Sequence, residues 1–572
     1  MTMHTKLNLP KHLSPIVEQA FVHWDSTDGT QRLWQRDPTL WANQDEDQWM
    51  GWLPPIDQAN DFADCIAKVS DDIDALGDLS TVKHIVLLGT GGSSRCVRLF
   101  DAVFSNRQPT RTLDIICETD TKLVNQLLAS RNLAETLFIV SSKSGKSLEI
   151  ECLRLFFSKL VRDALGDQHW SQQFIAITDP GSPLANIAGD QNYRGVIFTE
   201  PTIGGRYSAL SATGFVPALL LGLPVGQIAK TAAAMHQTCS QSLRASENPA
   251  VALGLTLAAL SQSGQDKVTI VTSPNIGAMS DWLEQLLAES TGKNGKGLIP
   301  ICNELIAAPE LYKDDRVFVY LRLSSDSDMQ QDQAIKALVD TDQTVIQITI
   351  DNKFAIGAEI LRWEIAITAA GAAMAINPFD QPNVATEKFP LSEMNASEQH
   401  PPSKPIFEDD QLQIYMDGMI VDAIGDTNNS LESIFAQFFS QLETSSYFAL
   451  LAFTPESQPN ISALTAIRRI IRDKTNTATM VGFGPNYLHS TAQLFKGGNN
   501  QGLFLQITYD DDEDLDIPTI DGTFNQVRLA QAIRNYRQMI ENDRRILRVH
   551  FCSPDHRTNL EKLNNIIIGS IS

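Results

Sequence analysis

Four hydroxyl side chains and two lysines stand close together in the stretch SSKSGKS, residues 141–147. An apolar run, Phe138–Val140, precedes the stretch, and a helical pattern begins at Leu148. Hydroxyls, ammonium groups and a flexible glycine between a strand and a helix suit the several oxygens of one phosphate monoester. The structural alternative is a serine-rich helix N-cap beside solvated lysines.

A second glycine turn, GTGGSSR, follows another apolar run and covers residues 89–95. Glycines let backbone N–H groups approach a ligand, and a helix N-terminus carries partial positive charge, so an anion is expected there. Taken alone, the turn fits a phosphate or sugar site, a dinucleotide loop or a mere tight turn. Ser94 replaces the third glycine of a dinucleotide loop, although Glu118 lies roughly where a ribose-binding acid would. Two such loops favour a sugar phosphate, because a dinucleotide fold needs only one.

A cation and a carboxylate complete the set of candidates. Arg206 follows a glycine pair in EPTIGGRYSALS, so its guanidinium can approach a ligand closely. Glu289 lies near the C-terminal end of the predicted helix in WLEQLLAESTGKNGKG. That is the unfavourable end of the helix dipole for a carboxylate, which favours a role for Glu289 as a base. The structural alternatives are a salt bridge for Arg206 and a surface acid for Glu289.

The elements that must position these residues are predicted by alternating patterns. Strand-like runs begin at residues 84, 112, 137, 174 and 195, with helical patterns between them. This rhythm predicts a parallel sheet covered on both faces. A long helical stretch, about 207–263, leads to further strand-like runs that begin at residues 267, 316 and 344.

The length of 572 residues is too great for one ordinary core. We predict an α/β fold with two similarly built lobes and a C-terminal α/β piece. The predicted regions are a helical, tryptophan-rich N-terminal extension (1–80), a first lobe (81–240), a second lobe (241–390), a linker (391–408) and a C-terminal α/β domain (409–572).

Composition narrows the class of protein. The net charge is −23, from 45 basic and 68 acidic side chains, which argues against nucleic acid or an anionic membrane as a partner. Seven scattered cysteines without a CxxC motif indicate reduced thiols, a cytoplasmic location and no zinc site. The N-terminus lacks the apolar core of a signal peptide. The acidic run at 510–516 has Leu515 where a calcium loop needs glycine, so we expect a solvated acidic loop.

Five motifs occur in a fixed order: GTGGSS, SSKSGKSLE, IGGRYS, AESTGKNGKG and NPFDQPNVATEK. They resemble the successive motifs of glucose-6-phosphate isomerases, which are built from two sugar-isomerase (SIS) domains. The resemblance covers about 80–565 and is greatest to the isomerase half of bifunctional transaldolase/phosphoglucose isomerases. It implies two SIS-type lobes with parallel sheets flanked by helices. It also implies reversible isomerisation of glucose 6-phosphate and fructose 6-phosphate through a cis-enediolate, with no metal and no other cofactor.

The resemblance assigns roles to individual residues. Glu289 would move the proton between C1 and C2, and Arg206 would stabilise the enediolate. Gln381 and Lys388 would contact the sugar, with Lys388 near the ring oxygen. The phosphate would be held by the two loops, through Gly91, Gly92, Ser93, Ser142, Lys143, Ser144 and Ser147.

The ring-opening histidine of the family is missing from its usual place, since no histidine lies between Glu289 and Lys388. The stretch GPNYLHSTAQLFKGG in the C-terminal piece carries His489, and the residues after it match the spacing of the family element. We therefore expect His489 to open the sugar ring, with Glu149 as its orienting carboxylate. The alternative is a histidine satisfied inside the third domain.

Three other functions remain open. They are a related aldose–ketose isomerase that also accepts mannose 6-phosphate, a non-catalytic sugar-phosphate-binding regulator, and a dinucleotide-dependent dehydrogenase. A regulator would not need a base, and the second phosphate loop disfavours the dehydrogenase. The expected partner is a small phosphosugar. Family members are typically dimers that supply the histidine across the interface, so a histidine on an appended domain makes either a monomer or a homodimer possible.

Overall fold

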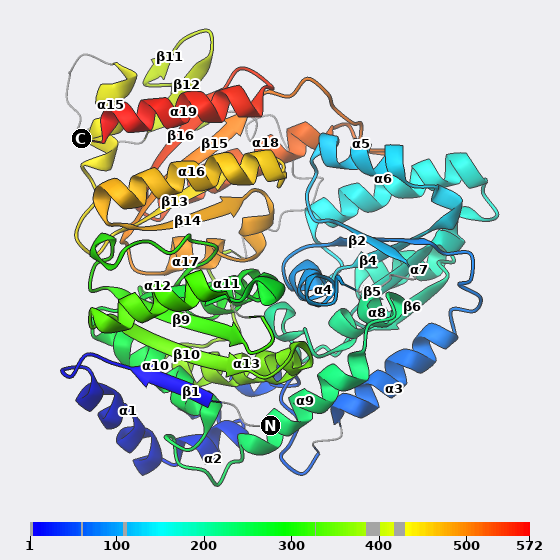
Figure 1. The fold of residues 1–572 in the computed structure, drawn as a ribbon. Helices are drawn as coiled ribbons and strands as arrows, with labels where there is room; N and C mark the ends of the chain where they lie inside the picture. The colour runs from blue at the N-terminus through cyan, green and yellow to red at the C-terminus, as the bar shows by residue number, and fades with distance from the viewer. Residues whose placement is uncertain are drawn as a thin grey trace.

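The computed structural model describes residues 4–58, 61–106, 111–326, 328–384, 401–416 and 430–571. It contains three sheets of largely parallel strands, with helices packed on their faces (Figure 1). The predicted α/β class is therefore confirmed. The domain boundaries stay a prediction, and most of the proposed linker lies outside the described residues.

The first lobe is a five-stranded parallel sheet in the order β3-β2-β4-β5-β6. Its strands are β2 (His84–Gly89), β3 (Thr112–Ile116), β4 (Thr136–Ser141), β5 (Phe174–Thr178) and β6 (Gly195–Phe198). Its helices are α4 (Gly92–Val103), α5 (Thr121–Ser130), α6 (Leu148–Leu165) and α7 (Pro183–Asp190). Strands β2 and β4 are neighbours, with Gly89 opposite Ser141. The two glycine- and serine-rich loops therefore leave the same edge of the sheet side by side.

The second lobe has the strand order β1-β10-β9-β7-β8. Its strands are β7 (Lys267–Thr272), β8 (Ile299–Ile301), β9 (Arg316–Leu323) and β10 (Thr344–Ile350), and its helices include α11 (Ala278–Thr291), α12 (Met329–Asp340) and α13 (Ile356–Ala373). The stretch predicted as one long helical region is divided into α8 (Ala212–Leu220), α9 (Val225–Thr238) and α10 (Pro249–Gln262). Turns at Gly222 and Pro224 and the Asn248 cap separate them.

The N-terminal extension is not purely helical, which corrects the prediction for residues 1–80. Strand β1 (His4–Asn8) joins the second-lobe sheet by antiparallel pairing with β10, and Figure 1 shows it in dark blue beside green strands. This five-residue run is mostly polar and lies at a sheet edge, so it carries no strand pattern of its own. Helices α1 (Ser14–Ser26), α2 (Gly29–Trp34) and α3 (Asp61–Asp74) follow it.

The C-terminal part is a mixed six-stranded sheet in the order β11-β12-β16-β15-β13-β14. Its strands are β11 (Phe407–Glu408), β12 (Leu412–Met416), β13 (Tyr447–Ala452), β14 (Ala478–Phe483), β15 (Gly502–Tyr509) and β16 (Arg545–Phe551). Its helices are α15 (Leu431–Phe439), α16 (Gln458–Thr475), α17 (Ala492–Gly497), α18 (Phe524–Glu541) and α19 (His556–Ser570). In Figure 1 it lies at the upper left, above the second lobe, and α18 approaches the first lobe near α5.

Close backbone packing and ion pairs hold this part against the lobes. A Cβ atom at Gly292, just after α11, would lie 2.3 Å from the Cα of Leu494 in α17, so the backbones approach closely. The acidic run is largely exposed, as expected for a solvated loop, although two of its residues make ion pairs. Asp511 pairs with Arg528, and Asp512 lies 3.3 Å from the ammonium of Lys122 in the first lobe.

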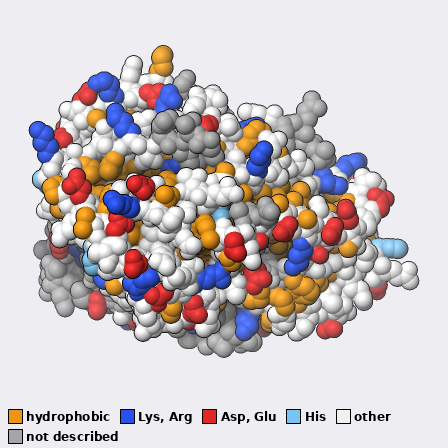
Figure 2. All heavy atoms as spheres, turned by 90° about the horizontal axis from the view of Figure 1, so that it is seen from below, with side chains coloured by type: hydrophobic (Ala, Val, Ile, Leu, Met, Phe, Trp, Pro, Cys, Tyr) orange, Lys and Arg blue, Asp and Glu red, His pale blue; other side chains and the backbone are white. Residues whose placement is uncertain are grey.

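On the face that Figure 2 shows, acidic and basic side chains are mixed and do not form separate regions. Lysine and arginine side chains alternate there with aspartate and glutamate, and the described residues of that face form no continuous basic patch. Among the described helices, none has the length and apolar character that crossing a membrane requires.

Candidate active site

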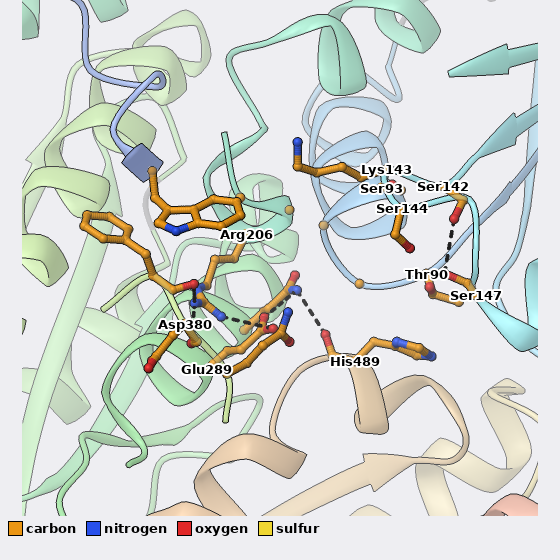
Figure 3. Close-up of a pocket in the computed structure, with 18 of the residues that line it drawn as sticks. Thr90, Ser93, Ser142, Lys143, Ser144, Ser147, Arg206, Glu289, Asp380 and His489 are labelled. Carbon is orange, nitrogen blue, oxygen red and sulfur yellow. Dashed lines mark hydrogen bonds and ion pairs between the residues drawn. The ribbon is translucent and has the colours of Figure 1, made fainter. Parts of the chain in front are cut away.

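A cavity of about 410 Å³ lies where the two lobes and the C-terminal part meet. Figure 3 shows Ser93, Ser142, Ser144 and Ser147 on one side of it, Arg206, Glu289 and Asp380 on the other, and His489 at a third position. Of the predicted site residues, eleven line the cavity: Gly91, Gly92, Ser93, Ser142, Lys143, Ser144, Ser147, Arg206, Glu289, Gln381 and His489. Glu149 lies directly behind His489, and Lys388 lies outside the described residues.

The loop after β2 is packed so closely that it requires glycine. Gly91 has a φ of 57°. A Cβ atom at Gly92 would lie 1.9 Å from the carbonyl oxygen of Gly205, in the turn that carries Arg206. The glycine pair thus brings the first loop directly against the GGR turn. Helix α4 begins at Gly92 and α6 begins at Leu148, so two helix N-termini lie at this end of the cavity, where they favour an anion.

The second loop presents hydroxyl groups to the cavity. The Oγ atoms of Ser142 and Ser147 lie 3.2 Å apart, and Ser144 lines the same wall. The ammonium of Lys143 is held by Asp179 at 2.8 Å and donates to the carbonyl oxygens of Glu200 and Pro201 at 3.1 Å. Its charge is therefore partly neutralised within the wall, and its role as an anion ligand remains a prediction.

Arg206 and Glu289 form a buried ion pair on the opposite wall. The Nη1 atom of Arg206 lies 3.0 Å from Oε1 of Glu289, and their side chains are 4% and 8% exposed. Its Nη2 donates to three successive carbonyl oxygens, those of Pro378, Phe379 and Asp380, at 3.1, 2.5 and 2.8 Å. Arg206 therefore does form a salt bridge, as the structural alternative predicted, and its partner is the candidate base. Glu289 is buried, so the alternative of a surface acid is wrong.

Gln285 positions the second oxygen of Glu289 and was missed by sequence reasoning. Its Nε2 donates to Glu289 Oε2 at 3.0 Å and to the carbonyl oxygen of His489 at 3.0 Å. The two side chains lie four residues apart on α11, so they face the same side of the helix. The four-residue spacing of Gln285 and Glu289 was the sequence signal that could have identified Gln285. Gln285 ties the carboxylate on the second lobe to the histidine on the C-terminal part.

Lys293 is a second residue that sequence reasoning missed. Its side chain is 1% exposed, and its ammonium donates to Oδ1 and to the carbonyl oxygen of Asp380, at 2.7 and 2.6 Å. Burial, and then the positive charge of Arg206, lower the pKa of Lys293 to about 8, although Asp380 and Glu289 act in the opposite direction. Lys293 and Arg206 therefore hold the same turn, Pro378–Asp380, from two sides.

His489 reaches the cavity from a short 3₁₀ helix, Asn486–His489, of the C-terminal part. Its Nε2 lies 2.8 Å from Oε1 of Glu149, in the first turn of α6. Its side-chain partner thus belongs to the first lobe and not to the third domain. Gln531 of α18 donates to the same Glu149 oxygen at 2.7 Å. Burial acts to raise the pKa of Glu149, but the charge and hydrogen bond of His489 and the bond from Gln531 leave it below the ordinary value.

The fold and this site define an α/β protein with two lobes of largely parallel sheet and an interlobe cavity that combines an anion cradle with a buried carboxylate–guanidinium pair. A family model, Phosphoglucose isomerase, matches residues 56–298. Over these residues the chain is similar to the phosphoglucose isomerases. The matched part includes both loops, Arg206 and Glu289, and ends before Gln381 and His489.

Individual relatives agree with the family model. A glucose-6-phosphate isomerase of Prochlorococcus marinus is 30% identical over 274 residues, which are 44% of this chain and 51% of that protein. A glucose-6-phosphate isomerase of Methanocaldococcus jannaschii is 24% identical over 390 residues, 58% of this chain and 92% of that protein. The chain thus spans about half of the first relative and most of the second. Likeness to bifunctional transaldolase/phosphoglucose isomerases stays a prediction.

The fold is also found in a solved structure. A hypothetical protein from Thermus thermophilus superposes with a TM-score of 0.56 at 18% identity. The match covers 67% of this chain and 98% of that protein. At this identity the likeness concerns the fold alone.

Proposed function

We propose that the protein interconverts glucose 6-phosphate and fructose 6-phosphate by ring opening followed by proton transfer between C1 and C2. The observation that carries the proposal is the buried Glu289–Arg206 pair, which faces two hydroxyl- and glycine-rich loops across one cavity. A base beside a cation, opposite an anion cradle, is the arrangement that aldose–ketose isomerisation of a phosphosugar needs.

The phosphate anchors the substrate in this account. The hydroxyls of Ser93, Ser142, Ser144 and Ser147 and the helix N-termini of α4 and α6 hold its oxygens. Because the phosphate is remote from the reacting carbons, its binding energy serves to place C1 and C2 at the opposite wall. Gln381 contacts the sugar from that wall, and Lys388 is assigned to the neighbourhood of the ring oxygen.

Proton transfer takes place at Glu289. The carboxylate removes the proton from C2 of the aldose and returns it to C1, while negative charge develops on the enediolate oxygens. The guanidinium of Arg206 stabilises that charge, and it is already oriented by three backbone carbonyls before the substrate arrives. Gln285 holds the carboxylate oxygen that does not face Arg206.

Ring opening is assigned to His489. The imidazole, oriented by Glu149, gives and takes the protons of the ring oxygen and the anomeric hydroxyl. Because His489 meets Glu149 within one chain, we propose that a monomer contains the whole site. We also propose a cytoplasmic location, in keeping with seven unpaired cysteines.

Turnover of fructose 6-phosphate tests the proposal, with the product detected by a coupled glucose-6-phosphate dehydrogenase. We expect fructose 6-phosphate to be converted to glucose 6-phosphate without added metal, and we expect the isomerase itself to consume no nicotinamide cofactor. Conversion of mannose 6-phosphate at a comparable kcat/KM would favour the broader isomerase. Binding of the phosphosugars without conversion would replace the proposal by the regulator.

The lowered pKa of Lys293 gives a pH-dependent prediction. The ammonium is charged below about pH 8 and loses its proton above it, which weakens its bond to the Asp380 carboxylate. We therefore expect KM for fructose 6-phosphate to rise above pH 8 in the wild type. Lys293→Met should show a raised KM at all pH values without that alkaline rise. Lys296→Met, at an exposed position of the same loop, is the control and should follow the wild-type profile.

The Gln531–Glu149–His489 chain predicts a separate defect in ring opening. Exchange between the α and β anomers of glucose 6-phosphate requires ring opening but no proton transfer at C2, and it can be followed by NMR exchange spectroscopy. We expect His489→Ala to abolish enzyme-catalysed anomer exchange. Gln531→Leu should slow it about 10-fold, since hydrogen bonds to charged groups contribute about 1.5–3 kcal/mol. Anomer exchange at the wild-type rate in His489→Ala would refute the assignment, and Gln458→Leu, exposed in the same domain, is the control.

A further inference from the structure

Part of the cavity wall comes from the N-terminal segment, for which the sequence indicates no chemical role. Asp45 and Trp49 line the cavity together with Phe379, Asp380 and Gln381. Both side chains are half-buried and come from a region that precedes the first lobe. The family model begins only at residue 56, so these two residues lie outside the matched part of the chain.

The segment around them, residues 41–53, is fixed to the motifs that carry the chemistry. Trp41 Nε1 donates to the carbonyl oxygen of Thr368 in α13 at 2.9 Å. The backbone N–H of Gly51 donates to the carbonyl oxygen of Thr202 at 3.2 Å, just before the GGR turn. The ring of Trp52 stacks on Tyr207, the neighbour of Arg206, with ring centroids 4.9 Å apart. These contacts hold the segment as a fixed wall.

Asp45 is oriented by two donors. Its Oδ2 accepts from Trp49 Nε1 at 3.0 Å, and its Oδ1 accepts from Asn377 Nδ2 at 3.1 Å. Asn377 in turn accepts from the backbone N–H of Phe379 at 2.9 Å. Hydrogen bonds through Asn377 therefore connect Asp45 to the turn before Gln381. An ionised carboxylate has about four acceptor sites, and these two bonds leave about two of them for a ligand.

The charge of Asp45 decides which end of a phosphosugar it can meet. The hydroxyl-rich loops and two helix N-termini attract the phosphate at their end of the cavity. A carboxylate beside Asp380 and Gln381 repels a phosphate but accepts hydrogen bonds from sugar hydroxyls. The indole of Trp49 adds a flat apolar face, and an aromatic ring can cover the C–H face of a sugar.

We propose that Asp45 and Trp49 form a sugar-recognition wall that binds the hydroxyls of the hexose at the end remote from its phosphate and prevents the reversed binding mode. The inference rests on the proposed function for the choice of a hexose phosphate as ligand. It assigns the tryptophan-rich segment a direct role in selecting phosphosugars over inorganic phosphate. Asp45 contributes hydrogen-bond acceptors, and Trp49 contributes apolar contact and the bond that orients Asp45.

Calorimetric titration of the full chain with fructose 6-phosphate and, separately, with inorganic phosphate tests this wall. In Asp45→Asn and in Trp49→Leu, we expect affinity for fructose 6-phosphate to fall about 10-fold, as loss of one charged hydrogen bond implies. Affinity for inorganic phosphate should stay unchanged, because the loops are intact. Asp47→Asn, which removes an exposed carboxylate of the same segment, should bind both as the wild type does.

Three results would overturn the inference. One is unchanged affinity for fructose 6-phosphate in both variants, and another is an equal loss of affinity for phosphate, which would show a merely structural role. The third is a wild type that binds none of fructose, glucose and mannose 6-phosphates more tightly than inorganic phosphate. If the wild type binds only mannose 6-phosphate and Asp45→Asn weakens that binding, the wall stands while the proposed glucose–fructose reaction fails.

Discussion

Glu289→Gln is expected to lower kcat for fructose 6-phosphate by about 10²- to 10⁴-fold, the contribution typical of a positioned general base. The amide keeps the shape of the carboxylate and can still meet Gln285 and Arg206, but it cannot accept the proton from carbon. Since the phosphate loops are untouched, KM should change little, which is the signature of an interaction made in the transition state.

The comparison needs a control for loss of a carboxylate elsewhere in the second lobe. Glu310→Gln removes an exposed acid near β9 and should leave kcat at the wild-type value. Initial rates over a range of fructose 6-phosphate concentrations separate the two parameters. Retention of wild-type kcat in Glu289→Gln would exclude this residue as the base.

Arg206→Met is the second substitution with a large expected effect, and it acts on both activity and stability. Loss of the cation that faces the developing enediolate should cost about 10²- to 10³-fold in kcat, as for other preorganised charge-stabilising groups. It also leaves Glu289 buried without its partner, at 8% side-chain exposure. Breaking a buried pair in this way typically costs about 3–5 kcal/mol of stability.

A double variant distinguishes these two consequences. Arg206→Met combined with Glu289→Gln removes both charges, so the unpaired buried carboxylate disappears. We expect its thermal midpoint to lie above that of Arg206→Met alone, while its activity stays at the level of the less active single variant. Additive losses of stability in the double variant would contradict a coupled pair.

Much of the first lobe could be predicted because short stretches of the sequence indicate its strands and loops directly. Its three central strands, β2, β4 and β5, are buried on both faces and read as largely continuous apolar runs. The loops that follow them carry glycine and serine at the strand ends. Strand β1 could not be predicted in the same way, because five mostly polar residues gain their strand conformation only from pairing with β10, far along the chain.

In the site, too, residues with local sequence signals could be predicted and residues that depend on distant contacts could not. Arg206, Glu289 and the loop serines stand in motifs with their own spacing, and the cavity brings them together. Gln531 and Asp45 stand in no such motif, and Lys293 lies in the motif of Glu289 without a spacing that marks its role. Each of the three acts through a partner that is distant in sequence: Glu149, Asn377 and Asp380. The buried network behind a site is a product of tertiary contacts, and a single sequence offers only weak signals for it.

Conversion of fructose 6-phosphate in D₂O, followed by NMR with the wild type beside Glu289→Gln, tests the central claim most directly. Proton transfer through a carboxylate that exchanges with solvent predicts glucose 6-phosphate with deuterium at C2 in the wild type, and neither product nor deuterium in the variant over the same time. Deuterium incorporation by Glu289→Gln at the wild-type rate, or a wild type that forms no glucose 6-phosphate, would contradict the account.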